Sequence, residues 1–479
     1  MSLFTPARRW QPPFYPFKRE RFSRRLLAKF ERLVKGPLFG CRMCGNCLLQ
    51  ETAFICPMGC PKGLRNGPCG GSTPDKCYVD QTRKCVWYEI YKRSVKLGRE
   101  EKLLEILPPM DWDKAGTETW GDVARNIRKV GTWKFAGSLF SRDKGKKRDV
   151  WESVFRPVRQ PEWWNGDSDY HPPANEEALS ELERRLKNGE FVVTTEITPP
   201  LGANTGKLKE NIEIVKPYVA AINFTDNSSA SPRMSSMACC KVAHDLDAEP
   251  VLQVAARGTS RCGLQAAIVG ANAMGIRNVL CISGDSARIG PSPMSNLQIL
   301  DLDSIQMLWI LRRMRDEGIY LDGRKMKFPP RLFLGAGTSL FAAEPELQAI
   351  REQKKFNAGA QYFQTNIVFD PDGLERWLEQ LDRKNILGKA YILVGISPLK
   401  SYKMARYLHF DVPGISIPEK IMERMEKAGD SELETGILIA QELIDSIKRK
   451  KGVNGIHLMT FGREDITKRL IIEGGLENK

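Results

Sequence analysis

Residues 190–200, EFVVTTEITPP, combine an apolar run rich in β-branched residues with a Thr-Glu pair and a Pro-Pro stop. This composition is typical of a buried strand that ends at the prolines, because proline cannot donate to a sheet ladder. Seven more runs of this kind follow along the chain. The eight predicted strands are 191–197, 219–224, 250–255, 278–283, 331–336, 360–365, 390–395 and 455–459.

Longer amphipathic stretches separate most of these strands. The predicted helices among them are 178–188, 263–274, 303–317, 347–357 and 371–383. Strand–helix alternation repeated eight times over about 300 residues fits an α/β fold of the (β/α)8, or TIM barrel, type. A doubly wound open sheet is the alternative. No G-x-G-x-x-G or G-x-x-x-x-G-K-[ST] motif follows a strand, which disfavours a dinucleotide-binding or P-loop fold.

The part of the chain before this alternation divides by composition. We expect a basic arm and a cysteine-rich domain over 1–110, a tryptophan-rich connector over 111–175, and the barrel over 176–479. A short helix is predicted around 21–34, and 86–107 has helical spacing. The connector should wrap over its neighbours with its aromatic rings buried, since a flexible linker would not carry so many. Its tryptophans are Trp112, Trp120, Trp133, Trp151, Trp163 and Trp164.

Eight of the twelve cysteines lie between residues 41 and 85. The first five follow the spacing C-x2-C-x2-C-x8-C-x3-C-P, and closely spaced cysteines of this kind can surround an iron–sulfur core. Eight thiolates suffice for two four-cysteine sites, so one or two [4Fe-4S] clusters are predicted. A structural zinc at one site stays open, as do disulfides. The predicted ligands are Cys41, Cys44, Cys47, Cys56, Cys60, Cys69, Cys77 and Cys85.

The expected cellular compartment and the distribution of charge along the chain limit the kinds of partner that the protein can have. The N-terminus has no apolar segment typical of a signal peptide and the chain has no long apolar run, so a cytoplasmic protein without a membrane span is expected. Residues 1–100 hold 20 Lys+Arg against 7 Asp+Glu, which accounts for most of the net charge of +15. A localised basic face favours an acidic partner such as ferredoxin or an electron-transfer subunit. Nucleic acid is disfavoured because no recognition motif accompanies the charge.

In barrels of this type the catalytic groups lie at the carboxyl ends of the strands. Glu196 ends the first strand, and a carboxylate shielded from water there suits a general acid. Asp285 follows a glycine in a tight turn after the fourth strand, and a helix cap is its alternative role. His457 is flanked by apolar residues and is interpreted as a structural histidine. Outside the cluster, the remaining cysteines lack ligand spacing and are interpreted as buried thiols: Cys239, Cys240, Cys262 and Cys281.

Residues 190–479 resemble the methylenetetrahydrofolate reductase family. The similar stretches occur in the order typical of that family and cover nearly the whole predicted barrel: TTEITPP, INFTDNSSASPRMSS, GIRNVLCISGDS, KKFNAGAQYFQTNIVFD, ILVGISPL and NGIHLMTFGR. Residues 41–90, with CRMCGNCLLQETAFICPMGCPKGLRNGPCGGS and CVWYEIY, resemble the cysteine-rich MetV-type protein that accompanies this reductase in acetogens and related anaerobes. The two appear here as a fusion.

The resemblance implies a flavin, FAD or FMN, and a tetrahydrofolate substrate. It implies that Glu196 is the general acid and that Asp285 supports the cationic intermediate. The other implied contacts are Thr225, Gln253, Arg257, Ser283, Gly284, Ala336 and Lys355 to the cofactor, with Lys355 on its phosphate, and Asn366, Tyr402 and Arg463 to the substrate.

Three positions depart from the family pattern. Ser283 replaces an arginine, Gln253 replaces a histidine and Asn366 replaces a glutamine. These three changes disfavour direct use of NADH as the electron donor. A flavin can instead accept single electrons from iron–sulfur clusters and deliver them in pairs to a two-electron reaction. We therefore expect electrons to enter through the clusters, in one-carbon metabolism of the Wood–Ljungdahl type, within an oligomer or larger complex. A folate/corrinoid methyltransferase and a non-catalytic iron–sulfur adaptor subunit are the alternatives.

Overall fold

The computed structural model describes residues 22–476 except 142, 165–166, 175, 287–290, 292–299, 341–343 and 413. The chain forms two compact units. The N-terminal unit comprises residues up to Pro68 together with Pro74–Ser168, and the barrel unit comprises Cys69–Thr73 with Asp169–Lys479. Within the described ranges, no helix has the length and apolar character needed to cross a bilayer.

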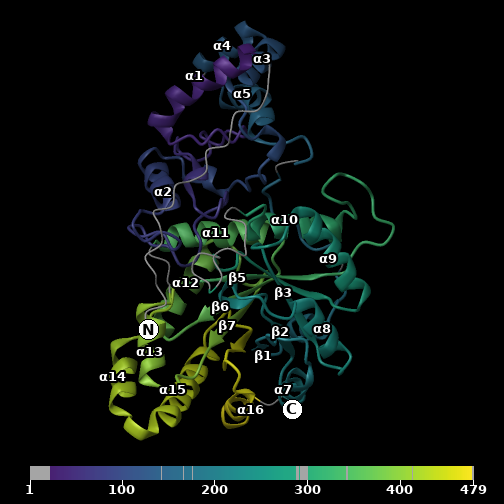
Figure 1. The fold of residues 1–479 in the computed structure, drawn as a ribbon, viewed down its shortest axis with the longest axis vertical. Coiled ribbons are helices and arrows are strands. Elements are labelled where there is room, and N and C mark those ends of the chain that lie inside the picture. The colour runs from purple at the N-terminus through teal and green to yellow at the C-terminus, as the bar shows by residue number, and fades with distance from the viewer. Residues whose placement is uncertain are drawn as a thin grey trace. The chain divides into compact units, whose positions relative to one another are not determined.

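The barrel unit contains eight parallel strands that close into a ring in sequence order, with β1 paired to both β2 and β8. The helices lie outside the strands, as Figure 1 shows. The predicted (β/α)8 barrel is confirmed. The strands are β1 (Val192–Ile197), β2 (Ala221–Phe224), β3 (Pro250–Ala255), β4 (Asn278–Ile282), β5 (Phe333–Thr338), β6 (Tyr362–Ile367), β7 (Tyr391–Ile396) and β8 (Gly455–Leu458).

Local signals define many of the helix boundaries. The Asp370 side chain accepts from the backbone of Asp372, and Pro371 occupies the first turn, where its missing N–H costs nothing. Asp303 and Gln306 form a reciprocal capping box at the start of α10. The helices of this unit are α6 (Glu181–Lys187), α7 (Gly206–Val215), α8 (Ser236–His244), α9 (Arg261–Ala273), α10 (Ser304–Asp316), α11 (Pro345–Asn357), α12 (Pro371–Arg383), α13 (Tyr402–Phe410), α14 (Glu419–Lys427), α15 (Glu432–Ile447) and α16 (Glu464–Glu473).

The barrel interior is apolar toward the amino ends of the strands. Side chains alternate along a strand, and residues paired in register share a face, so Val192 and its successors at every second position point inward. The buried cluster at this end is filled by large side chains from several strands, with α6 packed against it. Its strand members are Val192, Ala221, Val251, Leu280, Phe333, Tyr362 and Leu393.

Gly335 on β5 makes room for the Tyr362 ring in this core. A Cβ at position 335 would lie 2.1 Å from that ring. We expect Gly335→Ala to lower the free energy of unfolding by about 3 kcal/mol or more, because an overpacked core must shift to accept it. Gly270→Ala on α9, where a Cβ meets nothing within 4 Å, should instead raise it by about 0.5–1 kcal/mol. Thermal unfolding of the two variants measures both effects, and equal stability of the two would contradict the packing.

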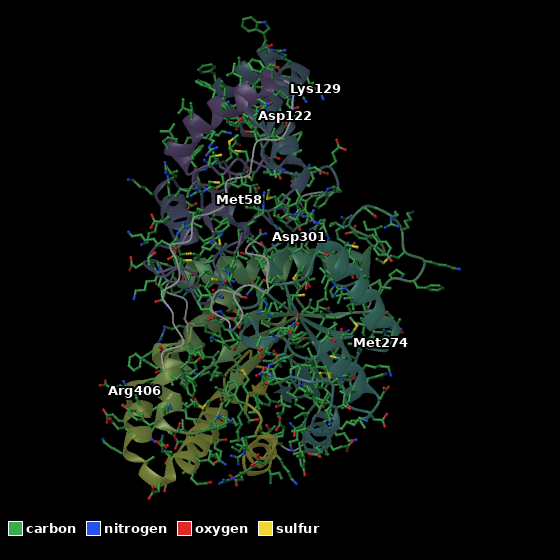
Figure 2. The ribbon with its side chains drawn as sticks, in the orientation of Figure 1. Met58, Asp122, Lys129, Met274, Asp301 and Arg406 are labelled. Atoms are coloured by element: carbon green, nitrogen blue, oxygen red, sulfur yellow. The ribbon has the colours of Figure 1, made fainter. Side chains whose placement is uncertain are left out.

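The N-terminal unit is helical around its cysteine loops. Arg24 on α1 pairs with Asp122 on α3 at 3.0 Å, and Asp122 is labelled with Lys129 of the same helix in Figure 2. The α-helices are α1 (Phe22–Phe39), α2 (Val86–Lys96), α3 (Trp120–Val130), α4 (Thr132–Phe140) and α5 (Lys144–Arg159), and the 3-10 turns are η1 (Pro57–Gly59), η2 (Glu100–Leu104) and η3 (Trp112–Lys114).

Several sequence expectations for this half of the chain need correction. The segment interpreted as a wrapping connector folds largely into α3, α4 and α5. Trp164 is buried as expected, but Trp133 is 91% exposed, because it lies on the outer face of α4. The helix expected over 86–107 ends at Lys96, before Gly98, which has a positive φ of 59°. Cys262, expected to be buried, is exposed at the start of α9.

A five-residue segment from the cysteine region, Cys69–Thr73, belongs to the barrel unit. It packs where the chain leaves β5 and where it follows α13. A Cβ added to Gly414 would lie 2.5 Å from Ser339 Oγ and 2.9 Å from Gly70 O, and Gly414 has a φ of +78°. Only glycine fits this close approach without strain. A short segment of the barrel unit is therefore contributed by the chain well before β1 begins.

Candidate functional site

The barrel interior becomes polar toward the carboxyl ends of the strands. The same inward alternation that carries the apolar core places amides, hydroxyls, a carboxylate and an imidazole at this end. Most of these side chains are buried. They are Thr194, Glu196, Asn223, Thr225, Gln253, Gln364 and His457, whereas Asn366 follows a register irregularity in β6 and is not placed by this alternation. Their position matches the face at which barrels of this type carry out chemistry.

Glu196 lies at the end of β1 with 13% of its side chain exposed. Its Oε2 lies 3.7 Å from Nε2 of His457, which is fully buried on β8. Sequence reasoning gave His457 no role beyond structure. His457 comes close to Glu196 because β8 pairs with β1 and His457 is in register with Thr194. This register cannot be recognised from the residues around His457 alone.

Two buried side chains beside Glu196 have polar atoms without a hydrogen-bond partner among the described residues. Both side-chain atoms of Asn223 are of this kind, and so is Oγ1 of Thr225. Asn223 is in register with Glu196. Since buried polar groups in proteins are nearly always satisfied, these atoms are suited to meet a bound molecule or water. Asn223 was not anticipated from the sequence.

Hydrogen bonds tie together the loops after β2, β3 and β4. Arg257 donates to the carbonyl oxygens of Asp226, Asn227 and Asp285 at 2.7–3.2 Å. Asp285 Oδ2 accepts from the backbone N–H of Ser229 at 3.1 Å. Arg257 thus holds the loop that presents Asp285, and its predicted cofactor contact stays a prediction.

Asp226 is a second carboxylate in these loops; it follows the second predicted strand, and the sequence analysis assigned it no role. Its Oδ2 accepts from Ala255 N at 2.9 Å, and its own N–H donates to Gln253 Oε1 at 3.0 Å. Burial raises the pKa of Asp226 above its usual value. Gly284 adopts a φ of +73°, where a Cβ would lie 3.0 Å from Ala255 Cβ, so a tight turn does precede Asp285.

The predicted contacts on β5 and β6 are partly engaged with the protein itself. Asn366 Nδ2 donates to Gly414 O at 2.6 Å, whereas its Oδ1 is buried without a partner in the described structure. Ala336 is buried on β5, and its register points it away from the barrel interior. Ser283 Oγ bonds Ser304 Oγ at 3.3 Å.

Lys355 on α11 is fully enclosed. It donates to Gly337 O at 2.8 Å and to both oxygens of Glu352 at 3.2 Å. Burial lowers the pKa of Lys355 to about 8 although Glu352 opposes the shift. A phosphate contact would require the ammonium group to leave these partners, and it stays a prediction.

The remaining predicted substrate residues lie at the starts of outer helices. Tyr402 OH donates to Glu426 Oε1 at 3.2 Å. Arg463, 45% exposed, pairs with Asp465 at 2.6 Å. On the same unit Asp301, labelled in Figure 2, accepts from the backbone and side chain of Arg261 at the start of α9.

The first four predicted metal ligands share one pocket in the N-terminal unit. Its lining combines those thiols with apolar side chains, among them Met58 (Figure 2), and the four are Cys41, Cys44, Cys47 and Cys56. Burial raises the pKa of Cys41 to about 12, and the neighbouring thiols Cys44 and Cys47 add to the shift. Within the described ranges, no three Cys, His, Asp or Glu side chains converge tightly enough to hold a metal ion.

A buried lysine supplies positive charge to this pocket. Lys35 Nζ lies 3.7 Å from Cys47 Sγ and 2.5 Å from Glu31 Oε1. It also donates to Thr119 Oγ1 at 2.8 Å, so three partners fix its position. Burial raises the pKa of the Cys47 thiol, and the ammonium group of Lys35 opposes that shift by favouring the thiolate, the form that binds metal.

The other four predicted ligands are divided between the units. Cys60, Cys77 and Cys85 belong to the N-terminal unit, and Cys69 belongs to the barrel unit. None of the twelve cysteines, all of which lie within the described residues, forms a disulfide. A second four-cysteine site stays a prediction.

Near the cysteine pocket, Glu51 gives a test of pH dependence. Burial raises its pKa from 4.5 to about 7, although Arg159 pairs with Glu51 Oε1 at 3.1 Å. A carboxyl whose pKa is raised in the folded state contributes stability below pH 4.5 that is lost as the pH rises through 7. The free energy of unfolding of Glu51→Gln, measured relative to that of the wild type, should therefore rise by about 3 kcal/mol between pH 4.5 and 7.5.

Denaturant unfolding of both proteins across this pH range measures the difference. Glu152→Gln is the control. Glu152 also pairs with Arg159, but the side chain of Glu152 is 40% exposed, so the stability of this variant relative to wild type should change little with pH. A Glu51→Gln difference that does not vary with pH would mean that Glu51 is ionised throughout.

The fold and the inward carboxylate at the carboxyl end of β1 define a (β/α)8 enzyme. A family model described as methylenetetrahydrofolate reductase matches residues 181–475, and a second, described as methylene-tetrahydrofolate reductase C terminal, matches 22–113. The chain belongs to the methylenetetrahydrofolate reductase family, whose members generally use a flavin. The prediction of a reductase of this class is thereby confirmed.

No curated protein matches the chain. Among solved structures, an uncharacterized protein from Clostridium thermocellum that binds two copies of 5-methyl-5,6,7,8-tetrahydrofolic acid is 16% identical, with 62% of this chain and 99% of that one covered and a TM-score of 0.44. A 2,3-dimethylmalate lyase (60% and 83% covered) and an oxaloacetate acetylhydrolase (62% and 86%) are each 10% identical with TM-scores of 0.34. All three TM-scores are low, so these likenesses do not bear on function.

Proposed function

We propose that this protein reduces 5,10-methylenetetrahydrofolate to 5-methyltetrahydrofolate, with a flavin at the carboxyl face of the barrel and electrons entering through a cysteine-bound iron–sulfur cluster. The observation that carries the proposal is the position of Glu196. Its carboxyl group ends β1 within a polar, largely buried layer, in a chain whose family performs this reduction.

The reaction requires a proton and a hydride. Breaking a carbon–nitrogen bond of the five-membered ring leaves an amine nitrogen that must be protonated, and Glu196 is the acid assigned to that step. When bound, the flavin supplies the hydride that converts the exposed methylene carbon to a methyl group. Asp285, held by Ser229 N and the loop that Arg257 braces, stabilises the positive charge that develops on the opened ring. Solvent then returns a proton to Glu196.

The residues at the carboxyl face fit a flavin and a pterin. Thr225 Oγ1, both polar atoms of Asn223 and Oδ1 of Asn366 are buried acceptors or donors that have no partner in the described structure. A heteroaromatic ring system rich in N–H and carbonyl groups satisfies such atoms. Fully buried Lys355 is the residue that fits least well, since it is held by Glu352.

Four cysteines line the pocket, which is the number of ligands that a [4Fe-4S] cluster takes. A zinc ion with four cysteine ligands is the alternative occupant. A [4Fe-4S] cluster instead holds its four thiolates around a larger core, which suits four cysteines lining one pocket. Lys35 beside Cys47 offsets part of the negative charge of such a cluster.

The electron donor we propose is an acidic carrier such as ferredoxin, or an acidic subunit of a larger complex. Support comes from the positive charge of residues 1–100, which contain 20 Lys+Arg and only 7 Asp+Glu. Such a field raises the rate of encounter with an acidic protein at low ionic strength.

An anaerobic half-reaction tests the proposal. The full chain is purified without oxygen, reduced with dithionite and freed of excess reductant, and 5,10-methylenetetrahydrofolate is added while absorbance is followed. Reoxidation of a flavin band together with a broad iron–sulfur band is expected. A protein without flavin, or a reduced flavin that folate leaves unchanged, would contradict the proposal.

A further inference from the structure

Three inward side chains at the carboxyl half of the barrel form a chain of contacts. Thr194 and Glu196 lie two residues apart on β1, and His457 on β8 is in register with Thr194. His457 Nδ1 lies 2.9 Å from Thr194 Oγ1, and its Nε2 lies 3.7 Å from Glu196 Oε2. His457 and Thr194 are buried, so bulk water does not compete for these contacts.

The hydrogen-bond capacity of Thr194 limits the protonation of the imidazole. Its Oγ1 lies 2.9 Å from His457 Nδ1, a contact in which the donor depends on the tautomer, and 3.3 Å from Ile456 O, to which it can donate. The hydroxyl has a single proton, and Nδ1 is the nearer of the two atoms. If Nδ1 accepts, the proton of the neutral imidazole is on Nε2, the nitrogen that faces Glu196.

Nε2 has no hydrogen-bond partner among the residues that the structure describes. A separation of 3.7 Å is too long for a hydrogen bond, but catalytic contacts often tighten only when substrate is bound. The carboxyl group proposed as the acid is therefore an acceptor that Nε2–H could meet.

We propose that His457 is a positioning residue for Glu196. Thr194 fixes the Nε2–H tautomer, and Nε2–H then binds Oε2 of Glu196 when the substrate enters. The carboxyl proton is thereby directed to Oε1, the oxygen left to face the substrate. This inference rests on the proposed role of Glu196 as acid.

Substitutions at Thr194 test the inference without removing either titratable side chain. Thr194→Val is nearly isosteric but lacks the hydroxyl, whereas Thr194→Ser retains it. We expect Thr194→Val to slow the folate-driven reoxidation of the reduced protein by about tenfold, the effect of one net hydrogen bond, and Thr194→Ser to restore most of the rate. Flavin content measured on each preparation controls for loss of cofactor.

A spectroscopic measurement on the full chain gives the second readout. Nitrogen-15 shifts of labelled histidine report which ring nitrogen carries the proton, and with four histidines in the chain His457 is assigned by the signal lost in His457→Gln. The wild type should show the Nε2–H form, and Thr194→Val should lose that preference. An Nδ1–H form in the wild type, or a Thr194→Val protein with unchanged tautomer and rate, would overturn the inference.

Different results would contradict the proposed function and the role of His457. If folate does not reoxidise the wild-type protein, the proposed function is wrong, whatever the tautomer. If the wild type reacts and Glu196→Gln does not, while both Thr194 variants react at the wild-type rate, the acid assignment stands and the role of His457 is wrong.

Discussion

Glu196→Gln is expected to slow the oxidation of the reduced protein by 5,10-methylenetetrahydrofolate by about 10²–10⁴-fold, the usual contribution of a general acid. Glutamine keeps the size and the hydrogen-bonding shape of the side chain but has no proton to transfer to the departing nitrogen. The flavin content should be unchanged, because Glu196 is not assigned a cofactor contact. Stopped-flow absorbance under anaerobic conditions measures the rate.

The same substitution at Glu190 is the control, since Glu190 precedes β1 at its other end and its side chain is 40% exposed. Glu190→Gln should react as the wild type does. A Glu196→Gln protein that retains the wild-type rate with its flavin bound would remove the acid assignment.

Cys44→Ser should remove the cluster proposed for the pocket, with a loss of about four iron atoms per chain. Serine is a poor ligand for iron–sulfur clusters, and Cys44 shares its pocket with three other thiols and with Lys35. The broad absorbance of the cluster should fall accordingly, and electron entry from an external donor should fall with it. Reduction of the flavin by dithionite should persist.

Cys239→Ser provides the matched control, because Cys239 is also a buried thiol but lies on α8, outside the pocket. Its iron content should equal that of the wild type. If Cys44→Ser leaves the iron unchanged and lowers zinc instead, the pocket is a zinc site and the electron route must be sought elsewhere.

The barrel could be predicted from the sequence because its strands carry strong local signals. Each strand is a short apolar run ended by polar or turn residues, and all eight predicted runs overlap the observed strands; β3, at Pro250–Ala255, agrees at both ends. The helix Pro371–Arg383 also agrees at both ends, since Asp370 and Pro371 mark its start. Tryptophan content, by contrast, misled the interpretation of residues 111–175. The spacing of Trp120, Val123, Ile127 and Val130 is helical and could have revealed α3.

The candidate site was less accessible from the sequence than the barrel was. Glu196 could be located because strand ends are visible in the sequence and chemistry gathers there. A closed eight-stranded barrel puts the last strand beside the first, but nothing local tells the register of β8 on β1, which brings His457 beside Glu196. The contact of His457 with Glu196 was missed for that reason, whereas Asn223 was missed because it lies inside β2, before the polar residues that mark the end of the strand. The hydrogen bonds from Arg257 to three carbonyl groups could not be predicted either, because those groups lie in loops from different parts of the chain.

The excursion of Cys69–Thr73 into the barrel unit has a consequence for how this chain can be divided. A gene cut at residue 168 would yield a barrel fragment that lacks five residues of its own unit, and an N-terminal fragment that carries them with no surface to pack on. The two units are interlaced along the sequence, so neither can be released by a single cleavage. Exchange of one unit for a homologous one would have to graft two separate stretches at once.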